Sequence, residues 1–184
     1  MKKIIYLFLC CCLVTIIACS GGSESSQSTD HKKRVEVAFG PYKVGEKFVN
    51  QGYEGHILHE INKHAYRASL DSFDITTMTL LVTSQGTIAA IEKSYELPEG
   101  LREFVNMLAY KLNINFRGGG TSYNYHDANI DITVSMKNNL YRWIPQLNDF
   151  SGIAEVAVID KQAYAQLERD IKQQEYKKAL TFQL

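Results

Sequence analysis

The chain has little of what cross-links or interrupts a small domain. All four cysteines lie within the first 19 residues, and only three prolines occur in 184 residues. Beyond Cys19 the chain can therefore form no disulfide bond, no cysteine–zinc site and no cysteine nucleophile. A folded domain in this part must be stabilised by core packing alone.

An excess of charge of one sign is also missing, as is a membrane-spanning run. The chain has 20 basic and 20 acidic residues. A near-neutral chain without a basic cluster gives no electrostatic basis for binding nucleic acid. The apolar run at residues 4–17 is 14 residues long, and a membrane-spanning helix needs roughly 20.

That apolar run follows Lys2 and Lys3 and ends in the sequence Ile-Ile-Ala-Cys at residues 16–19. A positive start before a short apolar run is typical of a secretory signal peptide. The ending resembles the lipobox of bacterial lipoproteins. This resemblance implies that Ala18 is the last residue removed and that Cys19 becomes an acylated N-terminus bound to a membrane. The alternative is an ordinary signal peptide with a chance cysteine.

Residues 20–30 read SGGSESSQSTD and contain no apolar side chain. Such a composition is typical of a flexible tether. We therefore expect a signal peptide at 1–18, a tether at 19–33 and one globular domain at 34–184. Removal of the signal peptide takes away two lysines, which leaves 18 basic against 20 acidic residues, a net charge of −2. Ser20 directly after the cysteine resembles lipoproteins that are sent to the outer membrane.

Hydrophobic spacing predicts an α+β domain with a mostly antiparallel sheet and helices packed on one of its faces. The expected strands are residues 35–39, a hairpin of 76–83 and 87–95, residues 130–136 with one polar face, and residues 153–159. The expected helices are residues 53–70, an amphipathic helix at 101–112, and a final helix capped by Asp160 with Tyr164, Leu167 and Ile171 inside.

One stretch resembles a known family. Residues 76–136 include LLVTSQGTIAAIEKS and NINFRGGG and resemble the C-terminal domain of TonB-type proteins. The tryptophan and proline usual in that family's post-helix loop are missing here, as are the proline-rich spacer and the spanning anchor. The resemblance therefore implies a similar sheet topology, and the family's role in energy transduction is not carried over.

The segment GHILHEINKH at residues 55–64 is the strongest candidate for a metal site. In a helix, His59 and His64 would point about 140° apart, so one zinc ion could not bind both, unlike the histidines of an H-E-x-x-H motif. His56, His59 and Glu60 fall within one turn and could bind a metal with a further ligand such as His126 or Asp127. The alternative is a set of polar residues on a solvated helix face. We assign no cofactor and no catalytic residue.

Two aromatic segments are the candidates for partner binding. Tyr123 and Tyr125 follow a triple-glycine loop at residues 118–120 and alternate, so they share one face if the segment is extended. They could stack on a sugar or a partner protein, or they could be ordinary cross-strand packing. A serine-hydrolase triad of Ser122, His126 and Asp127 is not expected, because adjacent strand residues point to opposite faces.

The second aromatic segment, Tyr141-Arg142-Trp143, holds the only tryptophan, and these residue types dominate interface hot spots. Pro145 predicts an irregular connection or a short helix here, and Trp143 could instead fill the core. From both segments we expect a membrane-anchored binder of a protein partner or envelope component, in an adaptor or immunity-type role. The alternative is a metal-dependent or acid–base hydrolase of envelope polymers.

Overall fold

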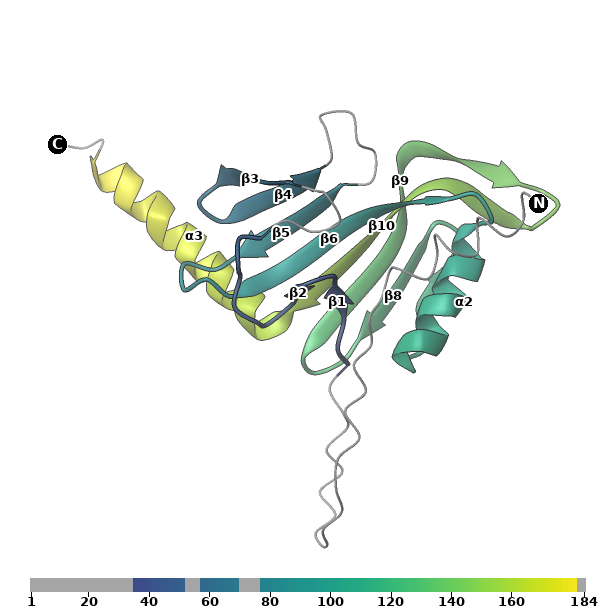
Figure 1. Ribbon diagram of the computed structural model, residues 1–184, viewed down its shortest axis with the longest axis horizontal. Coiled ribbons are helices and arrows are strands. Elements are labelled where there is room, and N and C mark those ends of the chain that lie inside the picture. Colours follow the sequence, from purple (N-terminus) through teal and green to yellow (C-terminus); the bar gives the residue numbers. More distant parts are fainter. Residues whose placement is uncertain (1–34, 52–56, 70–76, 182–184) are drawn as a thin grey trace, which may run out of the picture.

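The computed structural model describes residues 35–51, 57–69 and 77–181 (Figure 1). Within these residues the chain forms ten strands and two helices. The strands are β1 (Ala38–Phe39), β2 (Tyr42–Lys43), β3 (Ile57–Asn62), β4 (Ala65–Ser69), β5 (Met78–Val82), β6 (Ile88–Leu97), β7 (Arg117–Gly119), β8 (Ser122–His126), β9 (Ile130–Ile144) and β10 (Asp149–Asp160). The helices are α2 (Leu101–Leu112) and α3 (Lys161–Thr181).

Eight of the strands form one sheet in the order β3-β4-β5-β6-β10-β9-β8-β7, and every neighbouring pair is antiparallel. Strands β3 to β6 make one meander and β7 to β10 make a second. The two meanders meet where β6 pairs with β10, and α2 connects them along the chain. The predicted α+β class, the single domain and the antiparallel sheet are confirmed.

The front face of the sheet, defined here by Leu80 of β5, carries the main core. Helix α2 packs its buried Leu101, Val105 and Leu108 into this core. The β1–β2 hairpin covers another part of the same face with buried Phe39 and its neighbours (Figure 1). The helix and the hairpin together exclude water from the front face, which makes burial of this apolar area the main source of stability.

The back face carries a smaller core beneath α3. Buried Ala163 and Leu167 pack against Ala89 and Leu81. Because successive strand residues point to opposite faces, Leu80 and Leu81 of β5 belong to different cores. The helices therefore cover opposite faces of the sheet. The prediction from the sequence that both pack on one face is wrong in this respect. A β-bulge near the start of β6 sends Ala89 to the back.

Several predicted elements are confirmed. The hairpin is β5–β6, the amphipathic helix is α2, and β9 buries Ile130, Ile132 and Val134 while its alternate residues stay half-exposed. Asp160 caps α3 as expected, because its Oδ1 accepts a hydrogen bond of 2.8 Å from the backbone N–H of Ala163. Leu167 is buried on the inner side of α3, Tyr164 is half-buried, and Ile171 is exposed.

The helix expected at residues 53–70 is wrong. Its described part is the β3–β4 hairpin, turning at Lys63 and His64, and its remaining residues lie outside the described ones. Apolar residues four apart share a face in a helix, but they also share a face in a strand, since four is an even number. Ile57 and Ile61 are related in this way, and both are exposed on the edge strand β3. The spacing therefore did not distinguish the two structures.

Candidate functional site

The β9–β10 hairpin extends beyond the rest of the sheet as a projecting arm, residues 137–152 (Figure 1). Tyr141 to Ile144 of β9 pair with Asp149 to Gly152 of β10. Neighbouring strands do not follow the arm outward, because β8 pairs with β9 only as far as Ser135 and β6 pairs with β10 only from Gly152 onward. Within the described residues the arm is thus a two-stranded ribbon that no third strand joins.

A large bulge joins the arm to the sheet. Between the pairs Met136–Ala154 and Tyr141–Gly152, strand β9 has four residues where β10 has only Ile153. The backbones approach closely at this point, and Gly152 has a φ of 139°. A Cβ atom on Gly152 would overlap the carbonyl oxygen of Leu140 and lie 2.6 Å from Cα of Tyr141. The bulge redirects the hairpin, and glycine is the residue that permits it.

Aromatic side chains gather on one face of the arm. The ring centroids of Tyr141 and Trp143 lie 5.5 Å and 4.9 Å from the centroid of Phe150, with Tyr141 edge-on to Phe150 at 84°. Phe150 is half-buried, whereas Tyr141 is 41% exposed and Trp143 is 46% exposed. Such contacts restrict the orientations of the two outer rings.

Two leucines of the arm are also exposed. Leu140 at the bulge is 49% exposed and Leu147 at the tip is 50% exposed. We define the arm patch as Leu140, Tyr141, Trp143 and Leu147. Single exposed apolar residues are normal, but four large ones within residues 140–147 are a concentration that makes the arm a candidate interaction site.

The arm corrects two expectations about Trp143 and its neighbours. Beyond the bulge, Tyr141 to Ile144 form a paired strand, not an irregular connection, and Pro145 follows the strand end. Trp143 does not fill the core. Arg142 lies on the other face of the ribbon, is exposed, and donates a 3.4 Å hydrogen bond from Nε to Ser151 Oγ.

Asp149 fixes the base of the arm to α2. The residue before that helix, Gly100, has no side chain with which to cap it. The buried carboxylate of Asp149 supplies the cap, because its Oδ2 accepts a 2.7 Å hydrogen bond from the Arg102 backbone N–H. Arg102 also donates from Nη2 to the carbonyl oxygen of Asn148 at 2.9 Å. These contacts give the arm a rigid support at the positive end of the helix.

Tyr123 and Tyr125 are not part of the arm patch. Both lie on β8, opposite Val134 and Ile132 of β9, and both pack half-buried against the front core. The hydroxyl of Tyr125 donates a 3.1 Å hydrogen bond to Asp127 Oδ2. Cross-strand packing, the alternative considered from the sequence, therefore accounts for these rings. Residue type alone did not distinguish these half-buried rings from the exposed Tyr141 and Trp143.

The candidate metal ligands are not brought together. His59 and Glu60 are neighbours on β3 and point to opposite faces of the sheet, and five strands separate β3 from His126 on β8. His56 lies outside the described residues. Among the residues that the structure describes, no group of three or more His, Cys, Asp or Glu side chains could hold a metal ion. The described candidates His59, Glu60 and His126 therefore do not form one ligand set.

His126 belongs instead to a polar network that fastens α3 to the β8–β9 turn. Asp131 Oδ1 lies 2.8 Å from His126 Nδ1 and 2.9 Å from Lys161 Nζ. Burial alone would raise the pKa of Asp131, but the hydrogen bonds and positive charges of Lys161 and His126 outweigh it and lower the pKa. Lys161 also donates to the carbonyl oxygen of Asp127 at 2.6 Å. These contacts account for the positions of His126, Asp131 and Lys161 in the fold.

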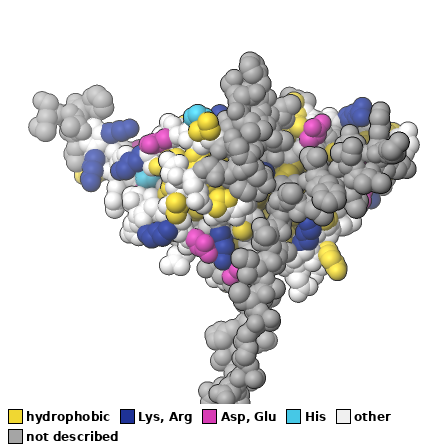
Figure 2. All heavy atoms as spheres, viewed as in Figure 1, with side chains coloured by type: hydrophobic (Ala, Val, Ile, Leu, Met, Phe, Trp, Pro, Cys, Tyr) yellow, Lys and Arg dark blue, Asp and Glu magenta, His cyan; other side chains and the backbone are white. Residues whose placement is uncertain are grey.

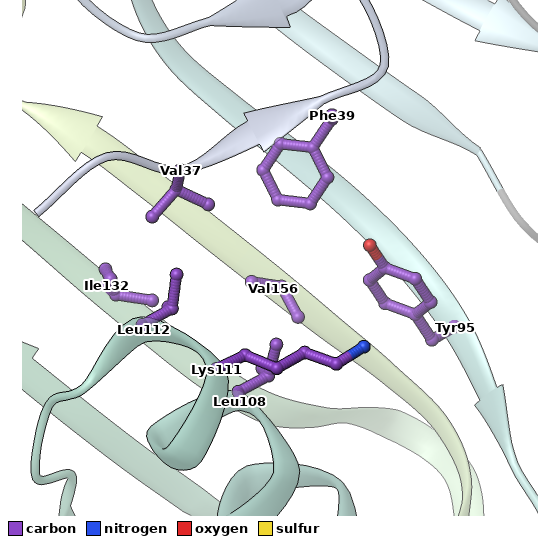
Figure 3. Close-up of a pocket in the computed structure, with 8 residues that line it drawn as sticks. All are labelled: Val37, Phe39, Tyr95, Leu108, Lys111, Leu112, Ile132 and Val156. Carbon is purple, nitrogen blue, oxygen red and sulfur yellow. The ribbon is translucent and has the colours of Figure 1, made fainter. Parts of the chain in front are cut away.

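A small apolar cavity lies between α2 and the segment before β2 (Figure 3). Its volume is about 20 Å³, which is room for about one water molecule. The lining residues are Val37, Phe39, Tyr95, Leu108, Lys111, Leu112, Ile132 and Val156. The Lys111 side chain extends across it toward Tyr95 (Figure 3). The cavity is a gap in the packing and is too small for an organic ligand.

Figure 2 shows hydrophobic side chains in small groups between charged ones on the face of the molecule seen in Figure 1. None of the helices in the described residues is both long and apolar enough to cross a bilayer. No protein-family model, no curated protein and no solved structure matches this chain. The arm patch is therefore the strongest candidate site, and it rests on the structure of the chain itself.

Proposed function

We propose that this chain is an envelope lipoprotein, anchored to the outer membrane by acyl chains on Cys19, whose folded domain binds a protein partner through the arm patch. This is an adaptor or immunity-type role without catalysis. The observation that carries it is the half-exposed set of Tyr141, Trp143 and two leucines on a ribbon that projects from the sheet. Tyrosine, tryptophan and arginine are the residue types that dominate interface hot spots.

The arm suits binding because its side chains are ordered in advance. Phe150 contacts both exposed rings, and Asp149 fixes the strand that carries Phe150 to α2. An ordered apolar surface loses little conformational entropy when a partner covers it, so more of the burial energy remains as affinity. Residues 19–33 would supply a tether between the domain and the membrane, which allows the domain to reach a partner held in the same envelope.

The anchor is tested by replacing single cysteines. We expect Cys19→Ser to move the protein from the membrane fraction to the aqueous fraction, because the acyl chains are attached to that thiol. Cys12→Ser is the matched control, since it changes a leader cysteine that is removed, and it should stay in the membrane fraction. A Cys19→Ser protein processed and retained like the native protein would contradict lipidation at this residue.

The binding surface is tested by recovering the native lipoprotein from its own membrane after crosslinking. A partner that depends on the arm should be recovered about tenfold less well with Tyr141→Ala combined with Trp143→Ala, since each truncates a potential hot spot. The control is Tyr110→Ala, which removes an 88% exposed tyrosine near the end of α2 that lies away from the arm. Thermal unfolding would show that the native protein and both variants are folded. Equal recovery of the partner with these three proteins would then rule out the arm as the binding surface.

A further inference from the structure

We infer that the arm binds an extended, acidic segment of the partner protein, which adds a strand to the open edge of β9 at Tyr141–Ile144. The inference rests on the proposed function, since it concerns the same surface. It specifies the conformation and the charge of what the arm patch recognises.

The first observation is the open edge. Tyr141–Ile144 pair with β10 on one side. On the other side the ladder with β8 ends at Ser135, followed by a 2.9 Å hydrogen bond from the Met136 backbone N–H to the carbonyl oxygen of Thr121. Within the described part of the chain, no strand pairs with this edge of Tyr141–Ile144. Outward N–H and C=O groups of such an edge are a template for another strand.

The second observation is how side chains alternate along that edge. Tyr141 and Trp143 lie on one face of the ribbon, and Arg142 and Ile144 lie on the other. A strand added beside β9 would place one row of its side chains next to the two aromatic rings and the other row next to Arg142. A segment that alternates apolar and acidic residues satisfies both rows.

The third observation is the charge of the arm. Residues 137–152 contain Lys137, Arg142 and one acidic residue, Asp149. Asp149 is buried, and its two oxygens accept hydrogen bonds from the backbone N–H groups of Arg102 and Phe150. The exposed charges of the arm are therefore both positive, and Arg102 adds a third at its base. The charge of Lys137 also acts on the carboxyl group of Glu92 on β6, so Arg142 is the cation of the arm that a strand added beside Tyr141–Ile144 would meet. A carboxylate-bearing segment complements these charges, whereas a second copy pairing by the same edge would bring like charges together.

The only tryptophan of the chain provides the readout, because Trp143 lies in the arm patch. Full-length lipoprotein in a non-ionic detergent is titrated with a short synthetic peptide that alternates valine and glutamate. We expect Trp143 emission to shift to shorter wavelength and saturate. A peptide that alternates valine and lysine should bind at least about fivefold more weakly, and affinity for the acidic peptide should fall with added salt. A peptide with proline at alternate positions should produce no shift, because it cannot pair as a strand.

Charge reversal is the decisive variant. Lys137→Glu combined with Arg142→Glu should exchange the preference, so that the valine–lysine peptide binds better than the valine–glutamate peptide. Arg142→Gln should reduce the preference for the valine–glutamate peptide by roughly two- to fivefold. This variant replaces the charge reversal as the test if the reversed protein does not fold. The inference is overturned by equal binding of the two charged peptides or by equal binding of the proline peptide. It would also be overturned if phosphatidylglycerol vesicles, added in place of the peptides, shifted the Trp143 emission. The same holds if the emission shifted because the protein associates with itself at higher concentration.

The failure of this inference differs from that of the proposed function. If partner recovery depends on Tyr141 and Trp143 but no peptide preference is seen, the arm binds a protein by another geometry and only the inference fails. If recovery does not depend on the arm, the proposed function itself fails.

Discussion

Replacing Gly152 by valine is expected to lower the free energy of unfolding by about 3 kcal/mol, because backbone strain and steric overlap act together at this position. The φ of 139° is a conformation that residues with a side chain rarely adopt. The added Cβ would also meet the Leu140 carbonyl and the Cα of Tyr141, which are backbone atoms and cannot move aside as a side chain can. Urea unfolding of the purified protein measures the loss.

Gly119→Ala is the matched control for this prediction. Gly119 lies on β7, its φ is not positive, and a Cβ there would have no atom within 4 Å. We expect this variant to change the free energy of unfolding by less than about 0.5 kcal/mol. A Gly152→Val protein as stable as Gly119→Ala, with Trp143 emission unchanged, would show that the two strands do not cross closely at the base of the arm.

Replacing Leu101 by alanine is expected to lower the free energy of unfolding by about 2–5 kcal/mol, the usual range for a leucine in a closed core. Leu101 begins α2 and is fully buried in the front core. The site is held by the Asp149 cap directly beside it, so the helix cannot easily shift to fill the cavity that the substitution leaves. Thermal and urea unfolding measure the effect.

Leu147→Ala makes the same chemical change at the tip of the arm. Because Leu147 is 50% exposed, its truncation should cost less than about 0.5 kcal/mol of stability. It should still weaken partner recovery, since Leu147 belongs to the arm patch. Equal destabilisation by the two leucine substitutions would mean that the arm packs against the domain and is not free to bind.

The elements that could be predicted from the sequence are those whose hydrophobic pattern is enforced by a core. Strand β9 alternates because Ile132 and Val134 are fully buried while its other face remains polar. Helix α2 shows a clear amphipathic pattern because Val105 and Leu108 face the sheet and Tyr110 faces solvent. In each case burial on one side selects the period that the sequence displays.

Prediction failed where that constraint is weak. Strand β3 is at the edge of the sheet, and most of its residues are exposed, so no core imposes an alternating pattern on it. The triple glycine was expected as a loop, yet Gly118 and Gly119 form β7 and pair with β8. Glycine carries no side chain to indicate a face, and such short pairings depend on contacts remote in sequence.

The sequence predicted which residue types would form the candidate site, but it predicted their positions only in part. Trp143 and Tyr141 are exposed, and Tyr123 and Tyr125 are half-buried, although all four are aromatic residues beside polar ones. What separates them is whether a second layer covers the strand, which is a property of the whole fold. The capping of α2 by Asp149, 47 residues beyond Arg102, has no local sequence signal at all.

The two meanders have a consequence for how the chain acquires its structure. Within each meander, strands that pair are separated by at most eight residues of sequence, so their pairing closes only small loops. The β6–β10 ladder is different, because it joins Ala90 to Ile159 and cannot form until the intervening chain has been ordered. We expect the two halves to assemble locally and this central seam to set the folding rate, since non-local pairing carries the larger entropic barrier.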